Sequence, residues 1–343
     1  EGDNKVGYIR LPKFYVNFYE DSNRDCAKDM LKEIEKLKAE NVKSIVLDLR
    51  NNGGGSLQAV VDIVGLFIKN GPVVQVKAPG KRPRVLRDTD NDVAYDGPLV
   101  VMVNQLSASA SEIFAAAIQD YDRGIIIGEP TFGKGTVQTI SSLSEGEIKL
   151  TRAKFYRISG DSTQNKGVKP DIAFPSIIDP TEIGESSLDY ALPWDQVRPV
   201  KYRRYGEPAR YLAALRARHE SRVEQEPNFV YLQSEVALSK ALRAQQTSIS
   251  LNREQRKREM DAQEAEQLAL ENKRRRALGM EPLSSFAELD AASDHIASAE
   301  SDLQQEIETQ DSTDEPAEDP IDQAQLQESA EILLHYAHLN GDR

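Results

Sequence analysis

The chain has 343 residues, of which 39% are hydrophobic and 29% are charged, and its formal net charge is −13. This length is enough for about two domains, and the negative charge argues against broad binding of nucleic acid. No apolar run reaches the roughly 18 residues that a membrane-spanning helix needs. Cys26 is the single cysteine, which excludes a disulfide within the chain and argues against a disulfide-stabilised scaffold.

The first 180 residues predict an α/β domain in which strands and helices alternate. Strands are expected at residues 6–11, 44–49, 73–76, 99–103 and 124–128, and helices at 22–40, 57–68 and after Ser109. Ser22 is a candidate N-cap of the first helix. Residues 81–96 are expected to form an exposed loop. From residue 146 the side chains alternate in character, which indicates strands at 148–151 and 153–157, followed by a loop at 159–166.

Past about residue 180 the composition shifts to Ala, Glu, Gln, Arg and Leu. Helices are expected at residues 209–218, 234–246, 254–278 and 323–338. Residues 300–322 hold many carboxylates and neither lysine nor arginine, which favours a solvated, disordered linker. We therefore predict a core domain at residues 1–180 and a mostly helical C-terminal domain at 181–343.

The stretch from Leu106 to Gln138 carries the residue types of a hydrolase. Three alternating serines, Ser107, Ser109 and Ser111, precede an apolar helix, and Lys134 follows between two glycines. All four histidines lie beyond residue 210, so the first half cannot form a Ser–His–Asp triad of its own. The base of such a serine would then be a lysine or a carboxylate, and because lysine is the known alternative to histidine, a Ser–Lys hydrolase is predicted. The pattern alone does not choose among the three serines.

Ser109 and Glu112 fit a capping box at the start of this helix, so the simpler interpretation is that Ser109 only caps the helix. A helix start is also where N–H groups can stabilise an oxyanion. The simpler interpretation of Lys134 is an ordinary loop lysine, because a base must be neutral and needs desolvation. In an extended segment Lys134, Thr136 and Gln138 would share one face, so Gln138 could hold the amine.

A nucleotide-binding loop is a rival interpretation, since residues 128–135 nearly fit the pattern G-x-x-x-x-G-K-[ST]. Gly135 stands where the pattern needs a hydroxyl. The following segment is rich in β-branched residues instead of being helical. We also disfavour Cys26 as a nucleophile, and His335 with His338 as a metal site, because no partner histidine or third ligand is apparent.

Three motifs in one order carry a family resemblance. They are Asp48-Leu49-Arg50-Asn51-Asn52-Gly53-Gly54-Gly55, then Ser107-Ala108-Ser109-Ala110-Ser111-Glu112-Ile113, then Gly128 to Gln138. In this order and spacing they resemble the C-terminal processing (tail-specific) proteases, the S41 serine peptidases, over roughly residues 5–180. Residues 184–202 and the helical tail resemble the proteobacterial Prc/Tsp-like branch. The implied fold is an S41 core, a crotonase/ClpP-like mixed sheet with helices, followed by a mostly α-helical C-terminal domain.

The resemblance implies a serine endopeptidase with Ser109 as nucleophile, Lys134 as general base and Gln138 orienting the base. The N–H groups of Ala110 and of a glycine in the turn at 53–55, with Gly54 favoured, would form the oxyanion hole. Supporting roles fall to four further residues: Gly55, Glu112, Asp120 and Thr131. No metal or nucleotide cofactor is expected.

The resemblance also implies polypeptide substrates with nonpolar C-terminal tails or unfolded chains, and a periplasmic location, with association to the inner membrane as a variant of it. Family members carry a PDZ domain before the core. The sequence starts near the core's first strand, so we expect such a segment elsewhere in cis or as a separate fragment. An adaptor protein could bind the helical domain. Two other functions stay open: a catalytically silent peptide-binding scaffold, and a crotonase-like acyl-CoA enzyme with a glycine-rich oxyanion hole.

Overall fold

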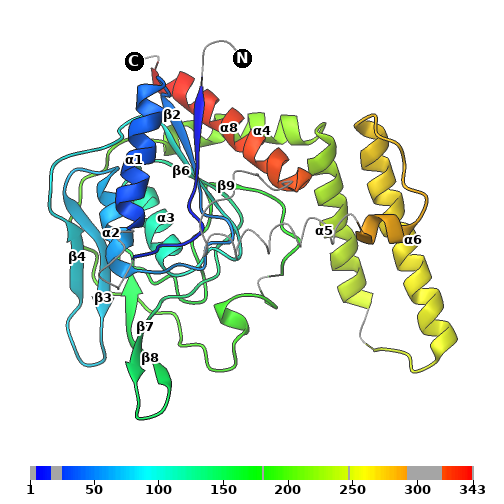
Figure 1. Cartoon of the computed structure of the whole chain (residues 1–343), viewed down its shortest axis with the longest axis horizontal. Coiled ribbons are helices and arrows are strands. Elements are labelled where there is room, and N and C mark those ends of the chain that lie inside the picture. The colour runs from blue at the N-terminus through cyan, green and yellow to red at the C-terminus, as the bar shows by residue number, and fades with distance from the viewer. Residues whose placement is uncertain (1–4, 17–24, 180, 246–247, 292–318, 342–343) are drawn as a thin grey trace. The chain divides into compact units, whose positions relative to one another are not determined.

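A computed structural model describes residues 5–16, 25–179, 181–245, 248–291 and 319–341. The chain forms two compact units, one of residues 1–174, 178–217 and 329–343 and the other of residues 175–177 and 218–328. The first unit contains both β-sheets and the motifs described above (Figure 1).

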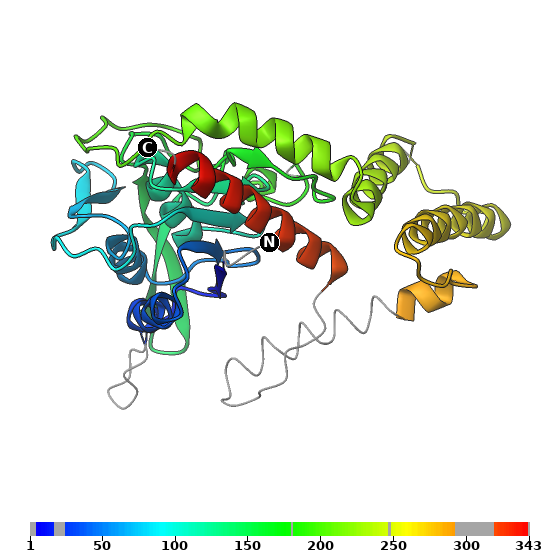
Figure 2. The ribbon, with the colours of Figure 1, turned by 90° about the horizontal axis from the view of Figure 1, so that it is seen from above.

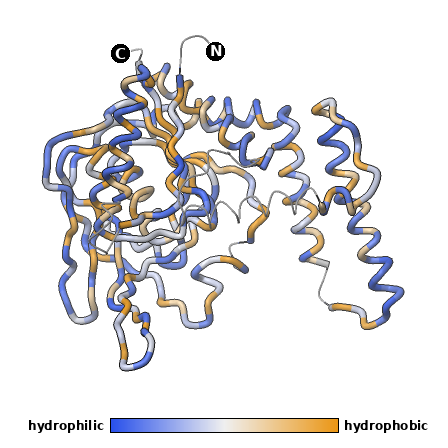
Figure 3. Tube along the Cα trace, viewed as in Figure 1, coloured by the Kyte–Doolittle hydropathy of each residue, from blue (hydrophilic) through white to orange (hydrophobic). Residues whose placement is uncertain are grey.

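The larger sheet of the first unit has five parallel strands in the order β1-β2-β5-β6-β9. Their bounds are Val6–Arg10 for β1, Ser44–Asp48 for β2, Leu99–Val103 for β5, Ile125–Gly128 for β6 and Ile172–Ala173 for β9. Every residue of β2, β5 and β6 is buried. Continuous apolar runs of this kind are typical of parallel strands covered on both faces. These strands are predominantly orange in Figure 3.

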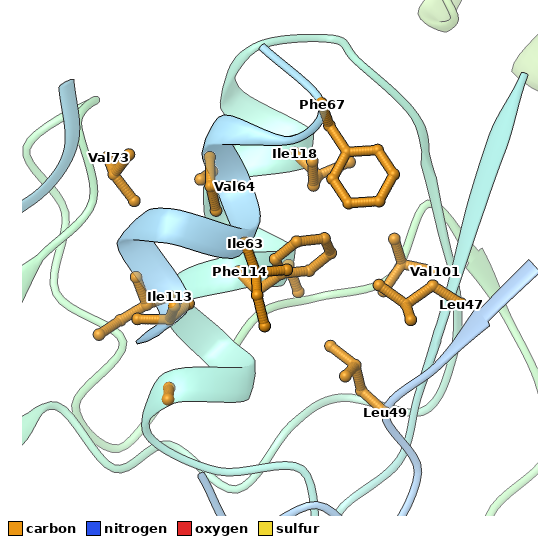
Figure 4. Packing of buried hydrophobic residues seen from close by; sticks show 14 of the residues in the cluster. Leu47, Leu49, Ile63, Val64, Phe67, Val73, Val101, Ile113, Phe114 and Ile118 are labelled. Carbon is orange, nitrogen blue, oxygen red and sulfur yellow. The ribbon is translucent and has the colours of Figure 1, made fainter. Parts of the chain in front are cut away.

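Three helices form a row next to this sheet, in the same order as along the chain: α1 (Cys26–Ala39), α2 (Leu57–Gly65) and α3 (Ala110–Asp120). Helix α2 lies between the other two, and α1 and α2 lie side by side in both ribbon views (Figures 1 and 2). Figure 4 shows Phe67, Phe114 and Ile63 facing Leu47 and Leu49 at the end of β2. The two phenylalanine rings meet edge to face at 5.8 Å. Burying each such side chain stabilises the fold by roughly 1.5–3 kcal/mol.

The second sheet is antiparallel, with strand order β4-β3-β8-β7. Its strands are β3 (Gly71–Lys77), β4 (Arg84–Asp88), β7 (Thr136–Ser142) and β8 (Glu147–Tyr156). The prediction of a loop throughout residues 81–96 is therefore wrong at β4. Its largely polar sequence does not indicate a strand, but it pairs with the mostly buried strand β3. Strand β7 is an edge strand and forms a hairpin with β8.

The remaining helices are α4 (Ala209–Val223), α5 (Pro227–Gln245), α6 (Arg253–Ala277) and α8 (Pro320–Gly341), with a short 3-10 helix, η1, at Glu185–Ser187. Within the second unit, α5 packs on α6, where Arg274 stacks on Tyr231 with its guanidinium carbon 5.1 Å from the ring centre. Helix α6 is largely hydrophilic (Figure 3). No described helix is long and apolar enough to cross a membrane.

Several expected boundaries differ from the observed ones. The N-cap of α1 is Asp25, whose side chain accepts from the Ala27 N–H, whereas Ser22 lies outside the described residues. Helix α5 starts seven residues before the expected Ser234. Of the expected acidic linker at 300–322, residues 300–318 lie outside the described chain, and α8 already begins at Pro320.

Candidate active site

The three sequence motifs meet at one edge of the parallel sheet. Strands β2, β5 and β6 are neighbours, so their carboxyl ends lie side by side. The glycine turn follows β2, the serine segment follows β5, and the loop of Lys134 follows β6. This edge is where open α/β sheets bind their ligands.

Ser109 lies on a strained turn just before α3. Its backbone angles are φ 58° and ψ −108°, and positive φ is uncommon for a residue with a Cβ. Gly54 lies directly against this turn: a Cβ on Gly54 would be 2.8 Å from the Ala108 carbonyl oxygen and 2.9 Å from the Ser109 Cβ. The glycine turn and the serine turn therefore fit together only because Gly54 has no side chain.

The structure separates the three serines. The hydroxyls of Ser107 and Ser111 are fully buried and donate to the carbonyl oxygens of Leu49 and Asn52, each at 2.8 Å. Ser109 is partly exposed. The two flanking serines therefore bind the turn to the segment after β2. Ser109 is left as the partly exposed serine, and it forms the capping box of α3 with Glu112.

Asn52 joins both turns and is completely buried. Its side chain donates to the Leu11 carbonyl at 2.6 Å and accepts from the Gly54 N–H at 2.9 Å. Its own carbonyl accepts from the Ala108 N–H at 3.0 Å and from the Ser111 hydroxyl. The motif that contains Asn52 does not predict this positioning role, because its partners Leu11, Ala108 and Ser111 lie far away along the chain.

The Glu112 carboxylate joins the serine turn to the loop that carries Lys134. One oxygen, Oε2, accepts from the N–H groups of both Ser109 (2.8 Å) and Lys134 (2.9 Å). The other, Oε1, accepts from the Gly133 N–H and from the Thr131 hydroxyl. The backbone nitrogens of Ser109 and Lys134 consequently lie within two hydrogen-bond lengths of each other.

Lys134 is half-buried, and desolvation by burial lowers the pKa of its amine, with Lys149 lowering it further. Glu185 and Glu112 act in the opposite direction. No hydrogen-bond acceptor for Lys134 Nζ occurs among the described residues. An amine in this environment loses its proton more readily than a lysine in water, as a general base must.

Two of the predicted residues do not join this cluster. Gln138 is exposed in β7 opposite Thr151, and within the described chain no hydrogen bond links it to Lys134. Strand β7 starts only at Thr136, so Lys134 lies outside the extended segment in which the shared face was expected. Asp120 lies at the opposite end of α3, roughly 16 Å along the helix axis, where it pairs with Arg157 at 2.5 Å.

The two expected oxyanion donors differ in their hydrogen bonding. The Ala110 N–H is the first of α3 and has no acceptor among the residues described, as is usual at a helix start. The Gly54 N–H donates to Asn52 Oδ1. Gly55 has φ 147°, and a Cβ there would lie 2.2 Å from the Phe14 carbonyl oxygen, so its place in the turn also requires glycine.

Two further side chains lie near the loop of Lys134, and no sequence pattern predicts their place in the site. Gln164 is fully buried and accepts from the Gly135 N–H at 2.8 Å, and its amide nitrogen donates to Glu185 at 2.9 Å. Gln164 lies in a polar stretch that was expected to be only a loop, and Glu185 lies beyond the predicted core boundary. Neither position has a local pattern that points to the site.

A cavity of about 850 Å³ lies elsewhere in the first unit. Its lining includes Pro98, just before β5, and Tyr121, at the end of α3, and does not include Ser109 or Lys134. A large cavity is often the default candidate for a binding site. Here the strained serine turn, the buried carboxylate and the half-buried lysine favour the carboxyl edge of the sheet instead.

Replacing Gly54 by alanine is expected to displace the serine turn. The new Cβ would need a positive φ of 103° and would approach the Ala108 carbonyl and the Ala110 N–H within 3.0 Å. We expect the reaction rate of the site to fall by roughly 100-fold, because small misplacements of reacting groups have effects of that size. Gly80→Ala is the matched control, since Gly80 also has a positive φ but open space around it. Equal loss in both variants would contradict this prediction.

Replacing Glu112 by glutamine is expected to uncouple the two turns. Burial raises the pKa of the Glu112 carboxyl to about 7, although the four hydrogen bonds that it accepts lower it. Below about pH 7 the carboxyl therefore gains a proton on an oxygen that already accepts a hydrogen bond, and that bond is lost. Activity should then fall as the pH falls through 7. Glu112→Gln, which places an amide N–H there at every pH, should be roughly 100-fold less active throughout pH 6–9.

The raised pKa of Glu112 also determines how the stability of the fold changes with pH. The folded protein binds a proton that the unfolded chain, with a carboxyl pKa of 4.5, has released by pH 7. The contribution of Glu112 to the free energy of unfolding therefore falls as the pH rises between about 4.5 and 7.

Glu145→Gln, at an exposed glutamate, is the control for the activity of Glu112→Gln. Wild-type kinetics in Glu112→Gln would refute the role of the shared carboxylate.

The chain belongs to peptidase family S41, a family of serine peptidases, whose model matches residues 5–174. Residues 178–338 match the C-terminal domain of tail specific protease. The family and the α/β core followed by a helical region were both expected from the sequence, and both expectations are confirmed.

Several named proteins resemble this chain. A tail-specific protease of Haemophilus influenzae is 42% identical over 83% of this chain and 41% of its own length. A carboxy-terminal-processing protease of Bartonella bacilliformis is 39% identical over 50% of this chain and 39% of its own length. The solved photosystem II D1 C-terminal processing protease is 34% identical, covers 51% of this chain and 42% of its own, and has a TM-score of 0.44. The chain thus spans about two fifths of the length of these relatives.

Proposed function

We propose that this chain is the catalytic part of a C-terminal processing serine endopeptidase that uses Ser109 and Lys134 as a dyad. The observation that carries the proposal is the Glu112 carboxylate, because one of its oxygens binds the N–H groups of both residues. Family membership and the relatives named as tail-specific and processing proteases support the same activity.

In the proposed reaction the Ser109 oxygen attacks a peptide carbonyl carbon while neutral Lys134 takes the hydroxyl proton. Lys134 then returns this proton to the leaving amine as the peptide bond breaks, which leaves an acyl-enzyme. Water attacks the ester, again with Lys134 as base, and releases the second product. The chain's own residues supply every proton transfer, so the mechanism needs no cofactor.

The carbonyl oxygen becomes negative in this reaction, and we assign its stabilisation to the Ala110 N–H together with the glycine turn. Use of the Gly54 N–H requires its hydrogen bond with Asn52 to be shared or exchanged when the substrate binds. Such donors at the start of a helix act where the charge develops and are usually worth several kcal/mol.

The substrate class is also a proposal. Strand β7 begins two residues after Lys134 and is an edge strand, so an extended peptide can pair with it beside the dyad. Ile140 and Leu143 on the same hairpin are 60% and 56% exposed, which suits substrates with nonpolar tails or unfolded chains. Gln138 keeps its proposed role in orienting Lys134, for which a bound peptide would have to rearrange the start of β7.

The proposed partners and cellular location of this protein are inferred from its family. A PDZ-containing segment, in cis or as a separate fragment, would present substrate tails, and an adaptor would bind the helical unit. We place the protein in the periplasm, with association to the inner membrane as an extension of that proposal.

The test is incubation of the purified chain with an unstructured protein and with a fluorophosphonate probe, followed by mass spectrometry of products and label. New peptides together with label on Ser109 are expected. Absence of both, in folded protein, would favour the silent scaffold. Binding of coenzyme A without peptide cleavage would favour the acyl-CoA enzyme.

A further inference from the structure

A segment beyond the S41 match reaches the loop of the general base. The S41 match ends at residue 174, yet residues 183–185 are bound to the site in three places. The Gln105 side chain donates to the Ile183 carbonyl at 2.8 Å, and the Glu185 N–H donates to the Phe132 carbonyl at 3.0 Å. The third bond joins the Glu185 carboxylate to the Gln164 amide at 2.9 Å.

Gln164 and Glu185 form a buried pair, with exposed fractions of 0% and 8%. Gln164 uses both ends of its amide, because its oxygen binds the Gly135 N–H and its nitrogen binds Glu185. Gly135 packs tightly on Gln164: a Cβ on Gly135 would be 2.8 Å from the backbone nitrogen of Gln164 and 2.9 Å from the Gln164 Cβ. The residue that follows Lys134 is therefore fixed as firmly as the residue before it.

The loop of Lys134 is consequently held from two directions. Glu112 of α3 binds the N–H groups of Gly133 and Lys134, whereas Gln164 binds the next N–H along the chain. Glu185 binds the loop at the Phe132 carbonyl. Three consecutive backbone donors are thus occupied by buried side chains, and the amine extends from the middle one.

The pair also adds a charge near the amine. Three charged groups act on Lys134 from the elements around it: Lys149 of β8, Glu185 of η1 and Glu112 of α3. Lys149 acts with burial to lower the pKa of Lys134, whereas the two carboxylates raise it. Removing one charge should therefore move the titration of Lys134 in a direction that depends on the sign of that charge.

We propose that Gln164 and Glu185 are positioning residues for Lys134, so that a segment from the tail-specific C-terminal region completes the base loop of the S41 core. The inference rests on the proposed function, in which Lys134 is the base. It assigns residues 183–185 to the working site and predicts that they are needed in any active form of the protein.

Glu185→Gln is the decisive variant, because its amide oxygen can still accept from Gln164 while the charge is gone. Without that charge the pKa of Lys134 falls. Since the base must be neutral, the acidic limb of kcat/KM should shift to lower pH, with kcat at alkaline pH kept within about threefold. Lys149→Met should shift the same limb to higher pH. Asp189→Asn, which removes a negative charge from an exposed position, should leave it in place.

Glu185→Ala removes the hydrogen bond from the Gln164 amide as well as the charge. We expect kcat to fall roughly 10- to 100-fold with KM nearly unchanged, and Glu185→Gln to restore it at alkaline pH. A merely structural role would lower the melting temperature of these variants without moving the pH profile. Wild-type kcat and an unshifted acidic limb in folded Glu185→Ala and Glu185→Gln would overturn the inference.

A second readout does not require peptidase activity. The rate at which a small amine reagent labels Lys134, followed by mass spectrometry across pH, reports its titration directly. The labelling curve should shift to lower pH in Glu185→Gln and to higher pH in Lys149→Met. An unshifted curve in Glu185→Gln would overturn the positioning role even if the wild-type chain cleaved nothing, whereas cleavage that persists in Ser109→Ala would overturn the proposed function alone.

Discussion

Ser109→Ala is expected to abolish peptide cleavage, with a loss of at least about 1,000-fold in kcat, because neither neighbouring serine can take its place. Ser107 and Ser111 are buried and already donate to carbonyl oxygens. The fold should stay intact, since alanine fits the same turn and the Ser109 N–H can still bind Glu112. The measurements are the rate of peptide release, fluorophosphonate labelling and the melting temperature.

Ser142→Ala is the control for this experiment, because Ser142 is an exposed serine at the end of β7. It should keep full activity and labelling. Near-normal turnover in Ser109→Ala would refute the nucleophile. Label on another serine in the wild-type protein would do the same.

Lys134→Met is expected to reduce kcat about as much as Ser109→Ala, because methionine fills similar space but cannot take a proton. The double variant should be little worse than either single one, since the two residues act as a unit. Lys134→Arg should be equally inactive, because a guanidinium remains charged at every accessible pH. Single-turnover rates of acyl-enzyme formation measure the affected step directly.

Lys169→Met provides the control at an exposed lysine, and we expect unchanged rates. If Lys134→Met forms the acyl-enzyme at the wild-type rate, another group is the base. The charge dependence described for Glu185 and Lys149 would then have no bearing on catalysis, although it would still describe the titration of the amine.

The elements that form the site edge could be predicted because their signals are local. The apolar runs of β2, β5 and β6 identify buried strands, and the glycines after β2 identify a turn that approaches another backbone closely. The histidine distribution favours lysine as the predicted base. The residue types alone did not choose among the three serines, whereas the family resemblance implied Ser109, and the packing shows that Ser107 and Ser111 are bonded to carbonyl oxygens.

Other features depend on contacts that a linear pattern does not contain. The burial of Gln164 follows from its bonds to Gly135 and Glu185, which lie 29 and 21 residues away. A polar stretch of this kind resembles a solvated loop when its partners are unknown. The alternation through Gln138 predicts one shared face with Lys134, but β7 begins only at Thr136 and leaves Lys134 in the preceding loop. Where a strand begins depends on its pairing, here that of β7 with β8.

The bonds that Glu112 makes to both turns have a consequence for inhibition in the proposed mechanism. A ligand would not need to cover Ser109 to stop the reaction. Displacing the loop of Lys134 by about 1 Å would lower the rate by roughly 100-fold while Ser109 itself stayed in place and accessible.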